Sequence, residues 1–268
     1  MALSEWLVRI PQWLSALLVF GFFVSFGVGA ILIVRRFVHH SVLKPYNDIS
    51  GFIYANIGVI YAVVFGLVIF NVGAEYNGAK QLVEHESAEA YQLYRDLNLY
   101  PNRVEADKVL VTLRNFTLSV VHDEFPAIKA LKWDSKYQPS LATHKASSDL
   151  WVAIAQIVPR NLHEQSLYNE ILKDVNSLSQ YRVKRRVMAR DDLPGVLWAV
   201  VVFGGLITIT FSALFGHENV RVHILITAIL ALMVSSGVFV IVTLNFPFSG
   251  NLSVSPDGYE YLIDLAKW

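Results

Sequence analysis

The sequence predicts an all-α integral membrane protein, and three observations support this fold class. Hydrophobic residues make up 54% of the chain and charged residues only 16%, which is too apolar for an ordinary soluble domain. Four uncharged apolar runs are long enough, at about 1.5 Å per residue, to cross a hydrocarbon core about 30 Å thick. A polar segment with helical spacing separates the second run from the third. We therefore expect four transmembrane helices and a helical bundle inserted between the second and third spans.

The first transmembrane hairpin is expected in residues 1–73. No charged residue lies between Trp13 and Val34, and the second span runs from Phe52 to Val72. The first run exceeds the roughly 7 to 15 apolar residues of a cleavable signal peptide, so we expect it to remain as an anchor.

The helical bundle is expected in residues 74–192. The apolar spacing of the second span continues through Ala79 and Leu82, which predicts one long rod that ends at "YPN", residues 100–102. A second helix is expected from Pro101 to near Pro126. Helical spacing returns in "SSDLWVAIAQIV" and again over residues 163–190, where one face carries Leu167, Ile171, Val175 and Leu178.

The second transmembrane hairpin is expected in residues 193–245, with spans from Pro194 to Phe215 and from His223 to Leu244. Proline is tolerated in the first turn of a helix, and Asp191 or Asp192 is expected to cap that end. Residues 246–268 then form a C-terminal tail.

Basic residues near the span ends predict the orientation. Seven lie near the bundle and the chain start, against four in the opposite loops. The seven are Arg9, Lys80, Arg182, Lys184, Arg185, Arg186 and Arg190, and the four are Arg35, Arg36, Lys44 and Arg221. This bias favours both termini and the bundle in the cytoplasm.

The second span carries polar and small residues on one helical stripe. At alternating steps of three and four, this stripe contains Gly51, Tyr54, Gly58, Tyr61, Phe65, Val68, Val72 and Glu75. Acyl chains offer tyrosine hydroxyls no partner, so the stripe should face another helix or water. Two interpretations stay open: the stripe packs inside a four-helix protomer, or it lines the axis of a homo-oligomer.

In the second interpretation, Gly58, Tyr61, Phe65, Val68 and Val72 line a pore with Glu75 at its mouth. A lining of this kind would contact inorganic ions, and the outside of the spans would contact the lipid bilayer.

A basic stripe occurs in "RVKRRVMAR", where Arg182, Arg186 and Arg190 are four residues apart on one helical face. Beside a membrane it could attract anionic headgroups, at about 1 kcal/mol per basic residue. It could equally pair with the acidic residues Glu84, Glu86 and Glu89. The functional hypothesis is that it attracts anions toward a pore mouth.

The segment "FPFSGNLSVSP" follows the last span. Pro247 and Gly250 predict a turn there. We expect this segment to lock against the bundle, and the alternative is a lip at an ion entrance.

Several chemistries are not indicated. Lys plus Arg equals Asp plus Glu, at 22 each, so net charge gives no support for nucleic-acid binding. The chain has no cysteine, and its histidine clusters at residues 39–40, 84–86 and 122–124 lack a specific ligand spacing, so no metal is expected. Nucleotide-binding and nucleophile motifs are also absent from the sequence, so we expect neither a cofactor nor an enzyme.

Six motifs together resemble the bestrophin-like family of bacterial membrane proteins, over roughly residues 50–265. They are "IYAVVFGLVI", "ESAEAYQLYRDL", "DEFP", "RVKRR", "DLPGVLW" and "FPFSGNLSVSP". The sequence departs from the family pattern at Phe125, where tryptophan is more frequent, and at Asn245, where aspartate is usual.

This resemblance implies a likeness to bestrophins, which are homo-oligomeric anion channels with four spans per subunit and a pore lined by the second span. It also implies a bacterial inner membrane location. The leading hypothesis is therefore an oligomeric, anion-selective channel. The alternative is a membrane-anchored scaffold or sensor whose bundle binds a partner, and a transporter is a third possibility.

Overall fold

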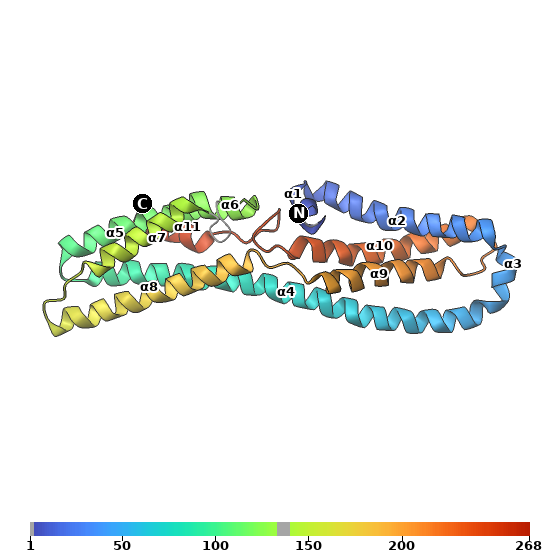
Figure 1. The fold of residues 1–268 in the computed structure, drawn as a ribbon, viewed down its shortest axis with the longest axis horizontal. Coiled ribbons are helices and arrows are strands. Elements are labelled where there is room, and N and C mark those ends of the chain that lie inside the picture. The colour runs from blue at the N-terminus through green and yellow to red at the C-terminus, as the bar shows by residue number, and fades with distance from the viewer. Residues whose placement is uncertain (1–2, 133–139) are drawn as a thin grey trace. The chain divides into compact units, whose positions relative to one another are not determined.

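The computed structural model describes residues 3–132 and 140–268, which form helices joined by short connections (Figure 1). The chain divides into two compact units. The membrane unit comprises residues up to Glu75 together with Asp192–Asn245, and the bundle unit comprises Tyr76–Asp191 together with Phe246–Trp268. Each unit has its own hydrophobic core.

Four helices of the described chain are long and apolar enough to cross a membrane. They are α2 (Gln12–Phe37), α4 (Asn47–Leu99), α9 (Gly195–Ser212) and α10 (Val220–Leu244). The shorter α1 (Leu3–Arg9), α3 (His40–Leu43) and η1 (Lys44–Tyr46) complete the membrane unit. Thus the four spans expected from the apolar runs are all present as helices.

Helix α4 is the long rod expected from the continuous spacing, and it ends at Leu99, just before "YPN". Its residues belong to the membrane unit as far as Glu75 and to the bundle unit from Tyr76. No loop interrupts the helix at this boundary.

The core of the membrane unit is apolar. Helix α2 packs on α10, and α9 contacts both (Figure 1). Gly27 of α2 lies so close to Ile209 and Thr227 that a Cβ atom there would be 3.0 and 3.1 Å from their methyl groups. Small residues allow such close approach between helices in lipid, where the hydrophobic effect does not drive helices together.

The start of the third span differs from the expectation in how the helix is capped. The N-cap of α9 is Pro194, and no side chain caps it, so the expected Asp cap is wrong. Asp192 instead accepts hydrogen bonds from Trp198 Nε1 at 3.4 Å and from Asn245 Nδ2 at 2.5 Å, because the extended Pro194 turns the chain before the helix begins.

In its described residues, the bundle unit contains the rest of α4 and six further elements. These are α5 (Arg103–Ser119), the π-helix η2 (Val120–Glu124), α6 (Phe125–Lys129), α7 (Leu141–Ala155), α8 (Leu162–Met188) and α11 (Asp257–Ala266). The expected helix from Pro101 to Pro126 is therefore three elements, since the chain passes through a π turn and places Pro126 in the first turn of α6.

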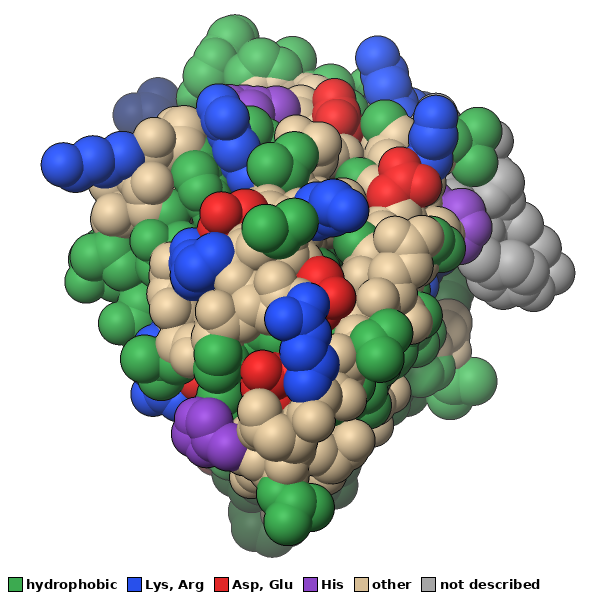
Figure 2. Space-filling view, turned by 90° about the vertical axis from the view of Figure 1, so that its left-hand side faces the viewer, with side chains coloured by type: hydrophobic (Ala, Val, Ile, Leu, Met, Phe, Trp, Pro, Cys, Tyr) green, Lys and Arg blue, Asp and Glu red, His purple; other side chains and the backbone are tan. Residues whose placement is uncertain are grey.

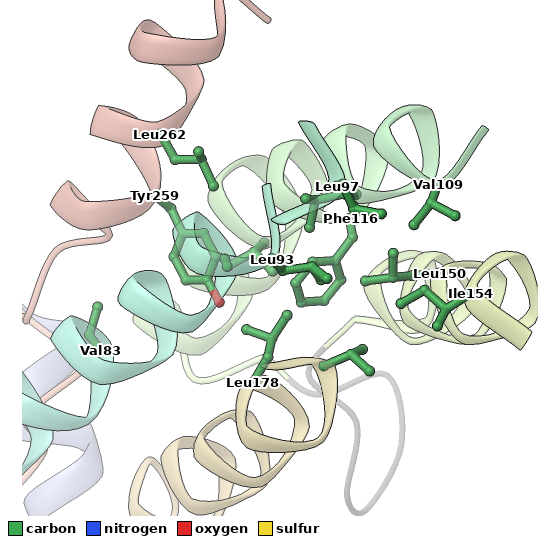
Figure 3. Close-up of a cluster of buried hydrophobic side chains, with 14 of the residues drawn as sticks. Val83, Leu93, Leu97, Val109, Phe116, Leu150, Ile154, Leu178, Tyr259 and Leu262 are labelled. Carbon is green, nitrogen blue, oxygen red and sulfur yellow. The ribbon is translucent and has the colours of Figure 1, made fainter. Parts of the chain in front are cut away.

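Side chains from five helices converge in the bundle core (Figure 3). Leu93 of α4, Phe116 of α5, Leu150 of α7, Leu178 of α8 and Tyr259 of α11 are each at most 2% exposed. The end of this unit at the α4–α5 and α7–α8 turns carries basic and acidic side chains of both signs, intermixed (Figure 2). Such a mixed surface is typical of contact with water.

Candidate functional site

The membrane section of α4 has one face that packs inside the protomer. The hydroxyl of Tyr61 donates a hydrogen bond to the carbonyl of Val201 on α9, at 3.0 Å. The rings of Tyr61 and Phe65 are stacked, with centroids 5.1 Å apart and an interplanar angle of 16°. Val68 and Val72 follow on the same face and are buried in the unit's core. This face therefore serves the internal packing of the membrane unit.

Three glycines on the neighbouring helices hold these two rings. A Cβ atom on Gly204 of α9 would lie 2.5 Å from the ring of Tyr61, and one on Gly205 would lie 3.0 Å from its hydroxyl. A Cβ atom on Gly237 of α10 would lie 2.5 Å from the ring of Phe65. The rings thus fit into positions that side chains larger than glycine would fill, which fixes α4 against α9 and α10.

The six residues predicted to line a pore do not all lie together. Tyr61, Phe65, Val68 and Val72 meet in the interior of the membrane unit, as the first interpretation of the stripe expected. Gly58 has open space where its side chain would be, and Glu75 is exposed. A pore-lining role for this stripe stays a prediction.

The opposite face of α4 is left uncovered by the protomer. At steps of three and four it carries Phe52, Asn56, Val59, Val63, Gly66 and Phe70, all exposed. Asn56 satisfies its amide within its own helix, donating to the carbonyl of Phe52 at 2.7 Å. Between Asp48 and Glu75 this helix has no charged residue. The face can therefore contact lipid, water or another copy of the chain.

A second candidate site is a buried charge cluster in the bundle unit. Arg185 of α8 binds Glu86 of α4 through two hydrogen bonds, Nε to Oε2 at 2.5 Å and Nη2 to Oε1 at 2.9 Å. Its Nη2 also donates to Glu124 of η2, at 3.0 Å. Arg182 donates to the other oxygen of Glu124, at 2.6 and 3.2 Å. Two arginines and two glutamates thus join α4, η2 and α8.

All four charged side chains of this cluster are at most 5% exposed. The guanidinium of Arg185 lies 4.7 Å from the ring centroid of Phe125, and that of Arg182 lies 5.5 Å from the ring centroid of Phe116. Burial alone raises the pKa of Glu124, but Arg185 and Arg182 outweigh this effect and hold the pKa below its usual value. The glutamate therefore stays ionised inside the bundle.

The π-helix explains how Glu124 reaches this cluster. A π turn adds a residue to the helical repeat and shifts the side chains that follow. As a result the consecutive residues Glu124 and Phe125 both enter the interior, at 0% and 7% exposure. Phe125, one of the two departures from the family pattern, packs edge to face on Phe248.

The three basic residues predicted to attract anions lie in different surroundings. Arg182 is buried against Glu124, Arg186 is partly buried, and Arg190 is exposed. Of the predicted acidic partners, Glu86 is paired, but with Arg185 rather than with a member of the stripe. The sequence did contain a signal for the burial of these arginines, because Arg182 and Arg185 continue the apolar face of Ile171 and Leu178 along α8.

The segment "FPFSGNLSVSP" locks against the bundle, as expected. Phe248 is 2% exposed, and the hydroxyl of Ser249 donates to the carbonyl of Ile128 at 3.0 Å. Gly250 has a φ of 75°, which glycine adopts without strain. The chain turns there toward α11.

The second departure from the family pattern, Asn245, has a local role in the membrane unit. Its Oδ1 accepts a hydrogen bond from the backbone N–H of Leu193 at 2.9 Å, while its Nδ2 donates to Asp192. An aspartate at this position could accept from Leu193, but it would place a second carboxylate against Asp192. The asparagine therefore suits the carboxylate that faces it.

No group of three or more potential metal ligands occurs within the part of the chain that the structure describes. Four apolar helices, glycine-mediated helix contacts and a separate polar bundle define a multi-pass membrane protein.

The chain belongs to the bestrophin-like domain family, whose model matches residues 21–259. Comparison with curated proteins and with solved structures gives no match.

Proposed function

We propose that this chain is one subunit of a homo-oligomeric ion channel of the bacterial inner membrane, with α4 along the conduction path. The observation that carries the proposal is the uncovered face of α4, because its opposite face is fixed to α9 and α10 by Tyr61 and Phe65. The family relationship supports a channel-type protein. We place the bundle and both termini in the cytoplasm, following the excess of basic residues.

In this proposal the path is lined by Asn56, Val59, Val63, Gly66 and Phe70, and the predicted lining by the Tyr61 stripe is the alternative. Glu75, which is exposed, lies beyond the end of this lining. Rings of carboxylates are typical of cation channels, and this face has none between Asp48 and Glu75. The absence of acidic groups supports anion selectivity, and Arg186 and Arg190 stay candidates for attracting anions.

The scaffold or sensor alternative also accommodates a stripe packed inside the protomer. Conduction separates the two hypotheses, since a scaffold passes no ions. Purified protein in planar bilayers should show anion currents, and silence of the wild-type protein would remove the channel hypothesis.

The first prediction concerns Phe70, which is 72% exposed on α4. Phe70→Ala should raise the unit conductance, because it removes a ring of phenyl groups from the path. The matched control is Phe203→Ala on α9, where the side chain is 62% exposed and should face lipid. Equal conductance in the two variants would place Phe70 outside the path.

The second prediction uses the absence of cysteine from the sequence. Val63→Cys should form disulfide-linked dimers under mild oxidation, because copies of α4 meet around an axis. Ile207→Cys, on α9 at 56% exposure, is the control and should stay monomeric on denaturing gels. The reverse pattern would assign the interface between copies to α9.

A further inference from the structure

Helices α4 and α8 meet in the bundle unit through the Glu86–Arg185 ion pair and the stacked rings of His85 and Tyr181, and the charged groups differ between this end and the Asp174 end. At one end, Glu86 of α4 meets Arg185 of α8. Ten residues later on α4 lies Asp96, and eleven residues earlier on α8 lies Asp174. Because the helices run in opposite directions, these two aspartates fall at corresponding positions, beyond the Leu93 and Leu178 pair seen in Figure 3.

Both aspartates are buried. Asp174 is 3% exposed and Asp96 is 8% exposed. The Oδ2 atom of Asp174 is fully covered and has no hydrogen-bond partner within the described residues. A buried carboxylate oxygen without a donor is costly when it carries charge.

The charged groups around Asp174 are mostly acidic. From α4 come Asp96 and Glu89, and from α8 itself comes Glu170. Two cations lie near, but both are directed at other carboxylates. Lys173 binds Glu170 at 3.1 Å with its side chain 71% exposed, and Arg95 binds Asp96 at 3.1 Å with its side chain 55% exposed. The positive charges that could offset the acidic groups therefore lie at the solvent-exposed edge of the contact between α4 and α8.

A proton can resolve this conflict better than a metal ion. A protonated carboxyl group turns an orphaned acceptor into a hydrogen-bond donor and removes the repulsion between like charges. A metal ion would need several ligands, and the described residues offer no group of three that could hold one. Burial, with Asp96, Glu89 and Glu170 adding to it, raises the pKa of Asp174 to about 6.

We propose that Asp174 is a proton-binding site between α4 and α8, next to Asp96, and that its protonation tightens the contact between these helices. At mildly acidic pH Asp174 carries the proton and α8 stays closely packed. Near neutral pH Asp174 is ionised, and this end of the contact loosens while the Glu86–Arg185 end holds. The proposal concerns the bundle unit alone and does not depend on ion conduction.

The sign of the pH dependence follows from linkage. The folded protein binds this proton more tightly than the unfolded chain, whose aspartates have a pKa of about 3.9. The stabilisation is therefore complete below about pH 4, and it is lost as the pH rises through about 6. This direction is opposite to that of Glu124, whose pKa is lowered.

Thermal unfolding of the full-length protein in detergent tests the proposal at pH 5.0, 6.0 and 7.5. Asparagine has the shape of protonated aspartate and donates from the same position. Asp174→Asn should therefore raise the melting temperature at pH 7.5 by a few degrees, on the order of 3 °C. At pH 5.0 the difference from wild type should be clearly smaller, because the stabilisation is only partly lost between about pH 4 and pH 5. Asp96→Asn should act in the same direction.

Two further measurements localise the effect. Asp149→Asn on α7, an exposed position, is the matched control and should follow the wild type at every pH. Hydrogen exchange of residues 170–178 should show lower protection at pH 7.5 than at pH 5.0 in the wild type, after correction for intrinsic rates. Asp174→Asn should show equal protection at both pH values.

Two results would overturn the proposal. One is an Asp174→Asn variant whose melting temperature parallels that of the wild type across the pH range, or falls below it at pH 7.5. The other is a rise in wild-type melting temperature with 1 mM Ca²⁺, at about pH 7.5, that Asp174→Asn abolishes, because that would identify the occupant as a divalent cation.

Discussion

The two halves of α4 are held by different chemistry. In the membrane unit, the rings of Tyr61 and Phe65 fit against glycines, with one side-chain hydrogen bond to a backbone carbonyl. In the bundle unit, the same helix holds its neighbour α8 through leucines and a buried Arg185–Glu86 pair. The difference follows from the surroundings, because lipid removes the hydrophobic drive between helices, whereas water supplies it.

This comparison also shows what each contact specifies. Ring-to-glycine contacts depend on shape, so they tolerate no added carbon. Buried ion pairs depend on charge. Removing both charges from water opposes folding, and the pair forms in only one register of the two helices. Three substitutions test the contrast, in decreasing order of expected effect.

The largest effect is expected in the bundle. Arg185→Met leaves Glu86 buried without its partner and should lower the free energy of unfolding by about 3–5 kcal/mol. Denaturation of the purified protein measures it. Lys184→Met, at the exposed neighbouring position, should change stability by less than about 0.5 kcal/mol. Similar losses in both variants would show that the buried cluster contributes little.

An intermediate effect is expected where α4 meets α10. Gly237→Ala forces a Cβ atom to within 2.5 Å of the ring of Phe65 and should destabilise the protein by about 1–3 kcal/mol. Gly29→Ala on α2 meets open space and should be neutral, which makes it the control. Adding Phe65→Leu should restore part of the loss. If it does not, the ring is not the obstacle.

The smallest effect is expected from the hydrogen bond of Tyr61. Tyr61→Phe keeps the ring and removes only the bond to the Val201 carbonyl, which should cost about 0.6 kcal/mol, the average for such bonds in membrane proteins. Tyr46→Phe, where the side chain is 59% exposed, is the comparison. Thermal unfolding in detergent compares the stability of the two variants. A larger loss of stability for Tyr46→Phe than for Tyr61→Phe would contradict a stabilising role of the Tyr61 hydrogen bond.

The spans were predictable from the sequence because membrane crossing requires long runs without charge. The predicted second span, Phe52 to Val72, lies within α4, and the rod that continues it is confirmed as far as Leu99. Helix α8, observed over Leu162–Met188, is close to the predicted 163–190, since its apolar face recurs at helical spacing. The pattern that made these predictions possible is local.

The site was less predictable because its contacts join distant parts of the chain. Arg185 and Glu86 are 99 residues apart, and Glu124 enters the cluster through a π turn that periodicity does not reveal. The aromatic stripe was visible in sequence, but its direction was not, since glycines on α9 and α10 decide which way Tyr61 and Phe65 face. Helix α11 lay within the predicted tail and was not anticipated.

The unbroken course of α4 through the bundle unit has a consequence for how the chain can vary in length. Insertion of one residue between Glu86 and Leu93 would rotate one of these side chains relative to the other by about 100° about the helix axis. Glu86, which meets Arg185, and Leu93, which is buried in the bundle core, would then no longer lie on the same face of the helix. A single-residue insertion within this stretch should therefore disrupt the bundle.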